Sequence, residues 1–169
     1  GSTPDTDRET AARLAALRPD TMRIYPTVAL RGTPLDGMVR SGAYIPPTLE
    51  ETVALCAELL LFFEEERDIP VIRLGLHASP DLEQNRVAGP WHPAFRELCE
   101  GRIYRDRAAS LLRECGIPPG PVRLLVHPRA LSAMIGQRRG NVVWFRERGY
   151  CVEVEGDPAL SRYRVKIGG

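Results

Sequence analysis

The chain has 169 residues, a formal net charge of +1, 43% hydrophobic residues and 27% charged residues. This composition is typical of a globular protein and argues against an intrinsically disordered chain. The longest apolar runs, such as residues 59–63, are far shorter than the roughly 18 residues that a membrane-spanning helix needs. Because no secretory leader opens the sequence and no disulfide framework is evident, we expect a cytoplasmic protein without a membrane partner.

The charges are divided unevenly between the two ends of the chain. Residues 1–119 hold 14 Lys and Arg against 18 Asp and Glu, whereas residues 120–169 hold 9 against 4. The net charges are therefore −4 and +5, which indicates a polyanionic partner for the C-terminal segment. Only one of the basic residues, Lys166, is a lysine, so the abundance of arginine by itself carries little weight.

The four cysteines lie too far apart for a metal site. They stand at positions 56, 99, 115 and 151, without a CxxC, a CxxxCxxC or a Cys/His cluster. We therefore expect no metal ligands in this chain, and no iron–sulfur cluster bound by it. Cys56 and Cys99 stand within helical apolar patterns and are expected to be buried thiols.

In the first part of the chain, helical and extended patterns alternate. Thr6 and Glu9 form a capping box that predicts a helix over 7–17, and strands are predicted at 21–25 and 28–30. Thr33 followed by Pro34 predicts a short helix that ends at 41–42. A second capping box, at Thr48, opens a helix through 66, and 69–76 reads as a buried strand. This order favours an α/β layer with a parallel sheet.

The second part of the chain reads as a separate α+β unit. Residues 77–92 are predicted to be a long loop, and 93–112 a helix that Gly101 kinks or divides. Three prolines in 115–121 predict a linker between a domain at 1–114 and one at 122–169. Within the latter we expect a strand, two helices and two strands, at 122–126, 128–135, 141–148, 150–155 and 161–167.

The loop between those two helices is rich in glycine and arginine. Helix N-terminal amides and two guanidinium groups in such a loop suit a nucleic-acid phosphate backbone. The element order and the residues Ile135, Gly136 and Val142 resemble a KH domain and its I-G-x-x-G-x-x-I loop, although Arg139 stands at the second glycine position. The resemblance implies an RNA contact through five residues, Gly136, Gln137, Arg138, Arg139 and Gly140. The alternative is a structural cap with solvated arginines.

Two further segments carry a second resemblance. Residues 23–33 read RIYPTVALRGT, and residues 88–98 read AGPWHPAFREL. With the pattern around 35–51 between them, they resemble the radical SAM barrel of the Elongator catalytic subunit and its bacterial relatives. Proteins similar to oxygen-independent coproporphyrinogen III oxidase share this architecture. The resemblance covers residues 3–112 and implies an α/β fold, the late half of a partial radical SAM (β/α) barrel, followed by the KH-like module.

The resemblance also implies cofactors and partners. Radical SAM enzymes use S-adenosylmethionine and a [4Fe–4S] cluster held by a CxxxCxxC motif, which is not present in this sequence. We therefore expect a C-terminal part of a larger enzyme, inactive alone. A partial barrel would expose a strand edge, so either the missing N-terminal half or a second copy is an expected partner.

The resemblance places four residues at the cofactor: Ile24, Tyr25, Pro26 and Arg73. In barrels of this kind, sites form at the carboxyl ends of strands. The alternatives are that Ile24 and Tyr25 belong to the core, and that Arg73 binds a buried acid, since a guanidinium within an apolar strand must be paired.

Three more residues are candidates for substrate chemistry, but no catalytic residue can be assigned. Arg31 follows a strand and could contact a phosphate or a carboxylate, the alternative being a salt bridge to Asp36. His77 and His92 border the long loop and could act as general acids or bases. For His92 the alternative is a hydrogen bond at the start of a helix.

Three functions remain open at this stage. The first is tRNA modification by a radical SAM enzyme whose basic C-terminal module binds RNA. The second is radical SAM oxidation of a porphyrin or another small molecule. The third is a non-catalytic module that binds RNA or protein.

Overall fold

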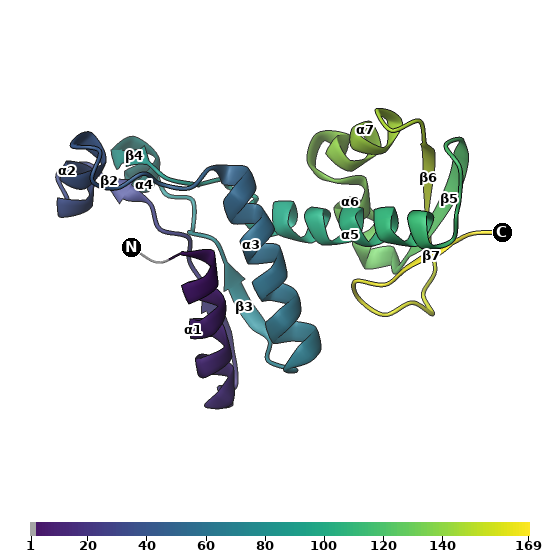
Figure 1. Ribbon diagram of the computed structural model, residues 1–169, viewed down its shortest axis with the longest axis horizontal. Coiled ribbons are helices and arrows are strands. Elements are labelled where there is room, and N and C mark those ends of the chain that lie inside the picture. Colours follow the sequence, from purple (N-terminus) through teal and green to yellow (C-terminus); the bar gives the residue numbers. More distant parts are fainter. Residues whose placement is uncertain (1–2) are drawn as a thin grey trace. The chain divides into compact units, whose positions relative to one another are not determined.

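A computed structural model describes residues 3–169, which form two compact units that divide between Arg96 and Glu97 (Figure 1). The first unit contains α1 (Pro4–Ala16), β1 (Met22–Ile24), β2 (Ala29–Leu30), α2 (Pro34–Arg40), α3 (Leu49–Leu61), the π-helical turn η1 (Phe62–Glu66), β3 (Val71–Leu74), α4 (Pro80–Asn85) and β4 (Arg86–Ala88). The second contains α5 (Phe95–Glu114) from Glu97 onward, β5 (Pro121–Val126), the 3-10 turn η2 (Pro128–Ala130), α6 (Leu131–Ile135), the 3-10 turn η3 (Gln137–Arg139), α7 (Gly140–Arg146), β6 (Cys151–Gly156) and β7 (Val165–Ile167). None of the helices in residues 3–169 has the length and apolar character that crossing a membrane requires.

The core of the first unit lies between a small sheet and two helices. β1 and β3 pair in parallel, as the sequence predicts, and α1 and α3 lie beside them (Figure 1). Small side chains on both helices permit close packing, and the buried apolar residues include Ala11, Ala15, Val53, Cys56, Ala57, Leu60, Val71 and Leu74. Each strand of this two-stranded sheet keeps one edge without a neighbouring strand in the described residues.

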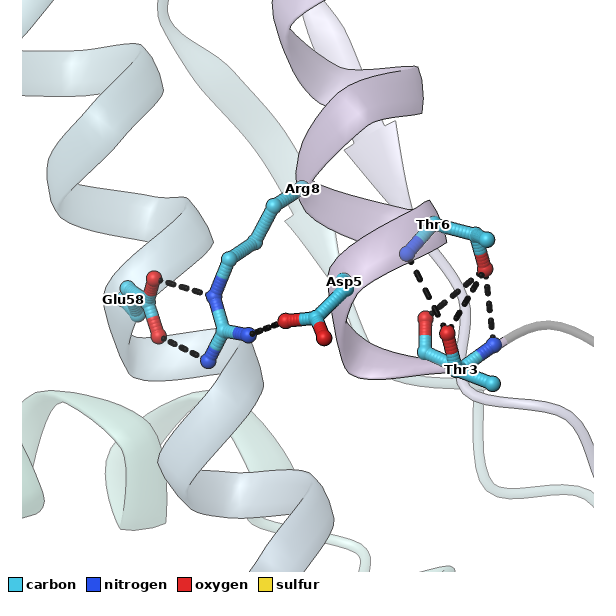
Figure 2. A network of polar contacts seen from close by, with 5 residues as sticks. All are labelled: Thr3, Asp5, Thr6, Arg8 and Glu58. Carbon is cyan, nitrogen blue, oxygen red and sulfur yellow. Dashed lines mark hydrogen bonds and ion pairs between the residues drawn. The ribbon is translucent and has the colours of Figure 1, made fainter.

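Helix α1 begins three residues earlier than the predicted start at residue 7. Thr3 is the N-cap, and its hydroxyl accepts the backbone N–H of Thr6 at 3.3 Å. The Thr6 hydroxyl accepts the Thr3 N–H at 2.7 Å, which completes a capping box (Figure 2). Pro4 occupies the first helical position, where the missing N–H is not needed. The predicted capping box of Thr6 with Glu9 is therefore wrong, because Thr6 lies inside the helix.

The Arg8 side chain connects α1 to α3 (Figure 2). Its Nε donates to Glu58 Oε1 at 2.6 Å and its Nη2 donates to Oε2 at 2.9 Å, while Nη1 donates to Asp5 at 2.8 Å. The hydrogen bonds from Arg8 lower the pKa of Glu58, so the two-pronged ion pair persists at neutral pH. Both side chains are about half exposed, which limits the pair to orienting the helices rather than stabilising them strongly.

Residues 77–92 contain regular structure, so the prediction of a long loop is wrong. The Ser79 hydroxyl accepts the Leu82 N–H at 3.2 Å and Pro80 fills the first position of α4. The strand β4 then pairs antiparallel with β2, with Ala29 opposite Ala88. The start of α4 carries the same Ser/Thr-Pro signal that correctly predicted α2 at Thr33.

Helix α5 is continuous, so Gly101 neither kinks nor divides it. A Cβ at Gly101 would lie 3.3 Å from the backbone oxygen of Ala133 in α6. The glycine therefore serves the close approach of two helices within the second unit. The segment 115–121 joins α5 to β5 inside that unit, since the compact unit already begins at Glu97.

The second unit has the predicted order of one strand, two helices and two strands. Its sheet has the order β6-β5-β7, with β5 parallel to β6 and antiparallel to β7. Alternate residues of β5 are buried, namely Val122, Leu124 and Val126, and Arg123 lies on the exposed face. Alternation of this kind is typical of a sheet that is covered on one face.

A polar clamp fixes the segment before β7 to α5. Tyr163 adopts a left-handed backbone with φ of 62°, which is strained for a residue with a side chain. Its N–H donates to the Tyr104 hydroxyl at 2.7 Å, and its carbonyl accepts from Arg107 Nη1 at 2.7 Å. Both tyrosine side chains are almost fully buried. These bonds compensate for the strained backbone.

Replacing Tyr104 by Phe should lower the free energy of unfolding of the second unit by about 1–3 kcal/mol, because the buried N–H of Tyr163 then lacks an acceptor. Urea unfolding followed through Trp144 fluorescence, in a Trp91→Phe background, measures the change. Tyr44→Phe is the control, since the Tyr44 hydroxyl has no hydrogen bond in residues 3–169. Equal losses in both variants would contradict the role assigned to this clamp.

Candidate functional site

The four residues predicted at a cofactor, at or next to the β1–β3 sheet, differ in their exposure. Ile24 and Pro26 are half-buried, and Ile24 stands opposite Leu74. Tyr25 is 48% exposed, so its alternative reading as a core aromatic is wrong. Arg73 is also exposed and has no ion pair in residues 3–169, so its pairing with a buried acid is wrong as well. Tyr25 and Arg73 thus remain available to a ligand.

The sequence analysis missed Arg23, which stands opposite Arg73 across the sheet. Arg23 is exposed, and it alternates along β1 with the half-buried Met22 and Ile24. Residues that pair across neighbouring strands lie on the same face, so the two arginines are neighbours. Alternation within β1 indicated the exposure of Arg23, but its partner depends on a register that the sequence does not display.

Arg31 does not form the salt bridge to Asp36 that the sequence left open. The buried Asp36 carboxylate accepts from Arg40 Nε at 2.8 Å and Nη2 at 2.9 Å, and from the Gly32 N–H at 2.9 Å. The hydrogen bonds from Arg40, and then that from Gly32, lower the pKa of Asp36. Arg31 is exposed and its charge contributes to lowering the pKa of Asp36, while its backbone N–H donates to the carbonyl of Asn85 at 2.8 Å.

The histidines divide between a structural and an open role. His92 Nδ1 accepts the backbone N–H of Ala94 at 3.0 Å, which confirms the hydrogen bond at the start of a helix. His77 is exposed. Beside His92, the indole Nε1 of Trp91 is buried, and in residues 3–169 it has no acceptor. No general acid or base is identified by these contacts.

The loop between α6 and α7 is shorter and more ordered than predicted. Its residues 137–139 form the turn η3, and Gly140 is already the first residue of α7. The N–H of Arg139 donates to the carbonyl of Gly136 at 2.9 Å, and the N–H of Gly140 donates to that of Gln137. The N–H groups of Arg139 and Gly140 are therefore engaged within the loop itself. Positive charge in this loop comes from the side chains of Arg138 and Arg139.

Asn141, which follows this loop, connects α7 to α5 and α6 through its side chain. Its side-chain Nδ2 donates to the carbonyls of Gly101 at 2.8 Å, Met134 at 3.1 Å and Ala133 at 3.2 Å. Asn141 is buried away from water, so these carbonyls provide the hydrogen-bond partners that its side-chain NH₂ group needs. A Cβ at Gly136 would lie 2.9 Å from Asn141, which explains why the position requires glycine, whose φ is +78°.

Arg138 and Arg139 both adopt a left-handed backbone. The φ of Arg139 is 62°, and that of Arg138 is 51°. Left-handed geometry suits glycine and costs other residues roughly 1–2 kcal/mol. Two consecutive arginines in this geometry are a strained feature, and strain of this kind is concentrated at functional positions.

The arginines of the second unit fall into a paired and an unpaired group. Arg123 pairs with Glu155 at 3.4 Å, and the Arg148 guanidinium lies 3.6 Å from the centre of the Trp144 ring. Within residues 3–169, four exposed guanidinium groups have no hydrogen-bond or ion-pair partner in the segment that carries α6 and α7: Arg129, Arg138, Arg139 and Arg146. This segment therefore presents uncompensated positive charge.

The cysteines do not fit an iron–sulfur cluster. Cys56 is buried in the first unit, and burial raises the pKa of its thiol to about 12, whereas a cluster ligand must be a thiolate. The other three cysteines lie in the second unit, and residues 3–169 bring no three His, Cys, Asp or Glu side chains together as a metal site. No reaction step through a cluster can therefore be derived from these residues.

The family model of the Radical_SAM C-terminal domain matches residues 19–105. The match spans half of the chain, from just before β1 into α5, and the chain belongs to this family. The family implies S-adenosylmethionine and a [4Fe–4S] cluster in the parent enzyme. Comparison with curated proteins gave no match, and neither did comparison with solved structures.

The lowered pKa of Asp36 predicts how the turn at 31–33 responds to acid. Because the folded-state pKa lies below the unfolded value of roughly 3.9, the carboxylate stabilises the turn above that pH and stops doing so as the pH falls through the folded value. The Gly32 amide signal in NMR should titrate with a midpoint below about 3.9. The titration should vanish in Asp36→Asn, and a midpoint at or above the ordinary value would contradict the contact.

Replacing Arg139 by Gly should raise the free energy of unfolding of the second unit by up to about 1 kcal/mol, since glycine relieves the left-handed strain. The control Arg146→Gly lies in α7 and should lower the same quantity by about 0.5–1 kcal/mol. Urea unfolding through Trp144 fluorescence distinguishes the two. A loss in both variants would show that the left-handed backbone carries no strain.

Proposed function

We propose that the chain is the C-terminal part of a radical SAM enzyme that modifies tRNA, and that its second unit is a KH-like module that binds RNA. Membership in the Radical_SAM C-terminal domain family supports the first part of this proposal. The unpaired arginines Arg129, Arg138, Arg139 and Arg146 are the observation that carries the second part.

The unpaired arginines are informative because other arginines of the same unit form ion pairs or hydrogen bonds that stabilise the fold. Arg123 pairs with an acid, and Arg107 donates to a buried backbone carbonyl. In contrast, Arg138 and Arg139 have no such partner in residues 3–169, and both adopt a strained left-handed backbone. Guanidinium groups of this kind bind phosphates in a planar, two-pronged geometry.

The module would read the RNA backbone rather than its bases. Trp144 is the large aromatic of this region, and the Arg148 guanidinium lies 3.6 Å from the centre of its ring, with that of Arg105 at 5.0 Å. A ring engaged in this way is not a free platform for base stacking. Phosphate contacts give affinity and salt dependence without sequence information, so the first unit and the rest of the parent enzyme would select the nucleotide.

The first unit would contribute to the reaction chamber of the parent enzyme. Tyr25, Arg73 and Arg31 are exposed there and could contact S-adenosylmethionine or the substrate. S-adenosylmethionine, reduced by the cluster, supplies the radical in such enzymes. The cluster ligands would come from the part of the enzyme that this chain does not include, or from another chain, since these cysteines do not fit them.

The double variant Arg138→Gln/Arg139→Gln should weaken tRNA binding about tenfold or more. It should also lower the slope of log affinity against log salt by roughly one for each lost phosphate contact. Fluorescence anisotropy with labelled tRNA over a salt series measures both quantities. The matched control is Arg123→Gln, because Arg123 is already neutralised by Glu155.

The control should bind tRNA as the unchanged chain does, and binding should be similar for tRNAs of different sequence. The RNA-binding role is rejected if the unchanged chain does not bind tRNA at low salt. It is also rejected if the double variant and Arg123→Gln lose affinity equally. The double variant should retain its helical circular dichroism, which separates loss of binding from loss of folding.

A further inference from the structure

A pair of arginines stands side by side on the exposed face of the β1–β3 sheet. Arg23 and Arg73 are paired residues in the parallel register, and both are exposed. In residues 3–169 neither guanidinium has a hydrogen bond or an ion pair. Two positive charges are thus brought together without any compensating acid.

An irregularity in the sheet creates this pairing. Met22 stands opposite Val71, but the next residue, Arg23, stands opposite Arg73, so that Ile72 is left over as a bulge. In a regular register Arg23 would face Ile72, which the bulge leaves 54% exposed. Bulges commonly re-aim side chains next to functional sites. Here the bulge turns an arginine–isoleucine pair into a pair of arginines.

The arrangement is unfavourable unless something negative binds to it. Like charges directly opposite each other destabilise a sheet. Ile72 does not compensate for this repulsion, because an exposed apolar side chain gives little of the free energy that burial would give. Tyr25 follows β1 two residues after Arg23 and is 48% exposed, so its hydroxyl is a further hydrogen-bond donor at this end of the strand. Two guanidinium groups and a phenol form a donor set that suits an anion with several oxygens.

We propose that Arg23 and Arg73 form a binding site for an oxyanion, either a phosphate or a carboxylate, on the exposed face of the β1–β3 sheet. The site lies entirely within the first unit, so it does not depend on RNA binding by the second. The bulge at Ile72 is the structural element that assembles it.

The test is a titration of the full chain with inorganic phosphate, and separately with malonate, at low ionic strength in chloride buffer. The arginine Nε–Hε signals in NMR report each guanidinium. Phosphate, malonate or both should shift the signals of Arg23 and Arg73 saturably, with one shared dissociation constant. The tighter of the two ligands identifies the source of the oxyanion. Arg23→Gln or Arg73→Gln should weaken binding at least tenfold.

Two control variants separate this site from general charge effects. Arg13→Gln removes an exposed arginine from α1, and Arg123→Gln removes an arginine of the second unit that already pairs with Glu155. Both should bind the oxyanion as the unchanged chain does. The proposal is overturned if neither ligand binds saturably, or if a control variant loses as much affinity as Arg23→Gln.

Thermal unfolding provides a readout that a purely structural role would not give. Without the oxyanion, Arg23→Gln should raise the melting temperature of the first unit, because it relieves the repulsion between like charges. Addition of the bound oxyanion should raise the melting temperature of the unchanged chain and not that of the variant. A lower melting temperature of the variant in both buffers would mean that Arg23 serves the fold alone.

Discussion

The side-chain amide of Asn141 is the contact on which the second unit depends. One NH₂ group on α7 is shared by three backbone carbonyls, one on α5 and two on α6, in a place that water does not reach. This fixes where the three helices meet, requires glycine at position 136 and leaves a tight fit at position 101, where a Cβ would lie 3.3 Å from the carbonyl oxygen of Ala133. The strained turn that carries Arg138 and Arg139 lies between Gly136 and Asn141 in the chain. A small buried network therefore determines where exposed charge is displayed.

The first unit also exposes unpaired arginines, but it does so through an irregular strand pairing rather than a strained turn. There the bulge at Ile72 departs from regular pairing, and the departure places Arg73 beside Arg23. In each unit, unpaired guanidinium groups are exposed where the backbone is irregular: at a β-bulge in the first unit and at a left-handed turn in the second. The surrounding core stabilises these irregular segments. Local violations that persist in a well-packed structure are expected where function, rather than stability, determines the residue.

Local signals in the sequence predicted much of the fold. Thr33 with Pro34, and Thr48 with Glu51, start helices where they were expected, because a cap depends on residues only three positions apart. Ser79 followed by Pro80 is the same kind of helix-start signal, but the polar residues around it favour a loop prediction. Arg40 stands four residues after Asp36 in the predicted helix, so helical spacing alone indicates that these two side chains can pair.

The candidate sites depended on information that is not local. For Arg73 the sequence leaves a cofactor contact and a buried acid as alternatives, and only the folded sheet shows that its side chain is exposed. The pairing of Arg23 with Arg73 depends on register between distant strands. Similarly, the sequence showed Arg139 at a glycine position, but it did not show that the backbone there is left-handed. The register between strands and the sign of the backbone angle φ are properties of the assembled structure.

The two edges of the β1–β3 sheet limit what main-chain pairing can achieve there. β1 has three residues and β3 has four, and Pro70 directly precedes β3 while Pro26 follows β1 closely. Proline has no N–H to donate, so a strand added at either edge would form a ladder of only a few rungs before it ended. Such a short ladder provides few main-chain hydrogen bonds, so the edges themselves are poor templates for aggregation.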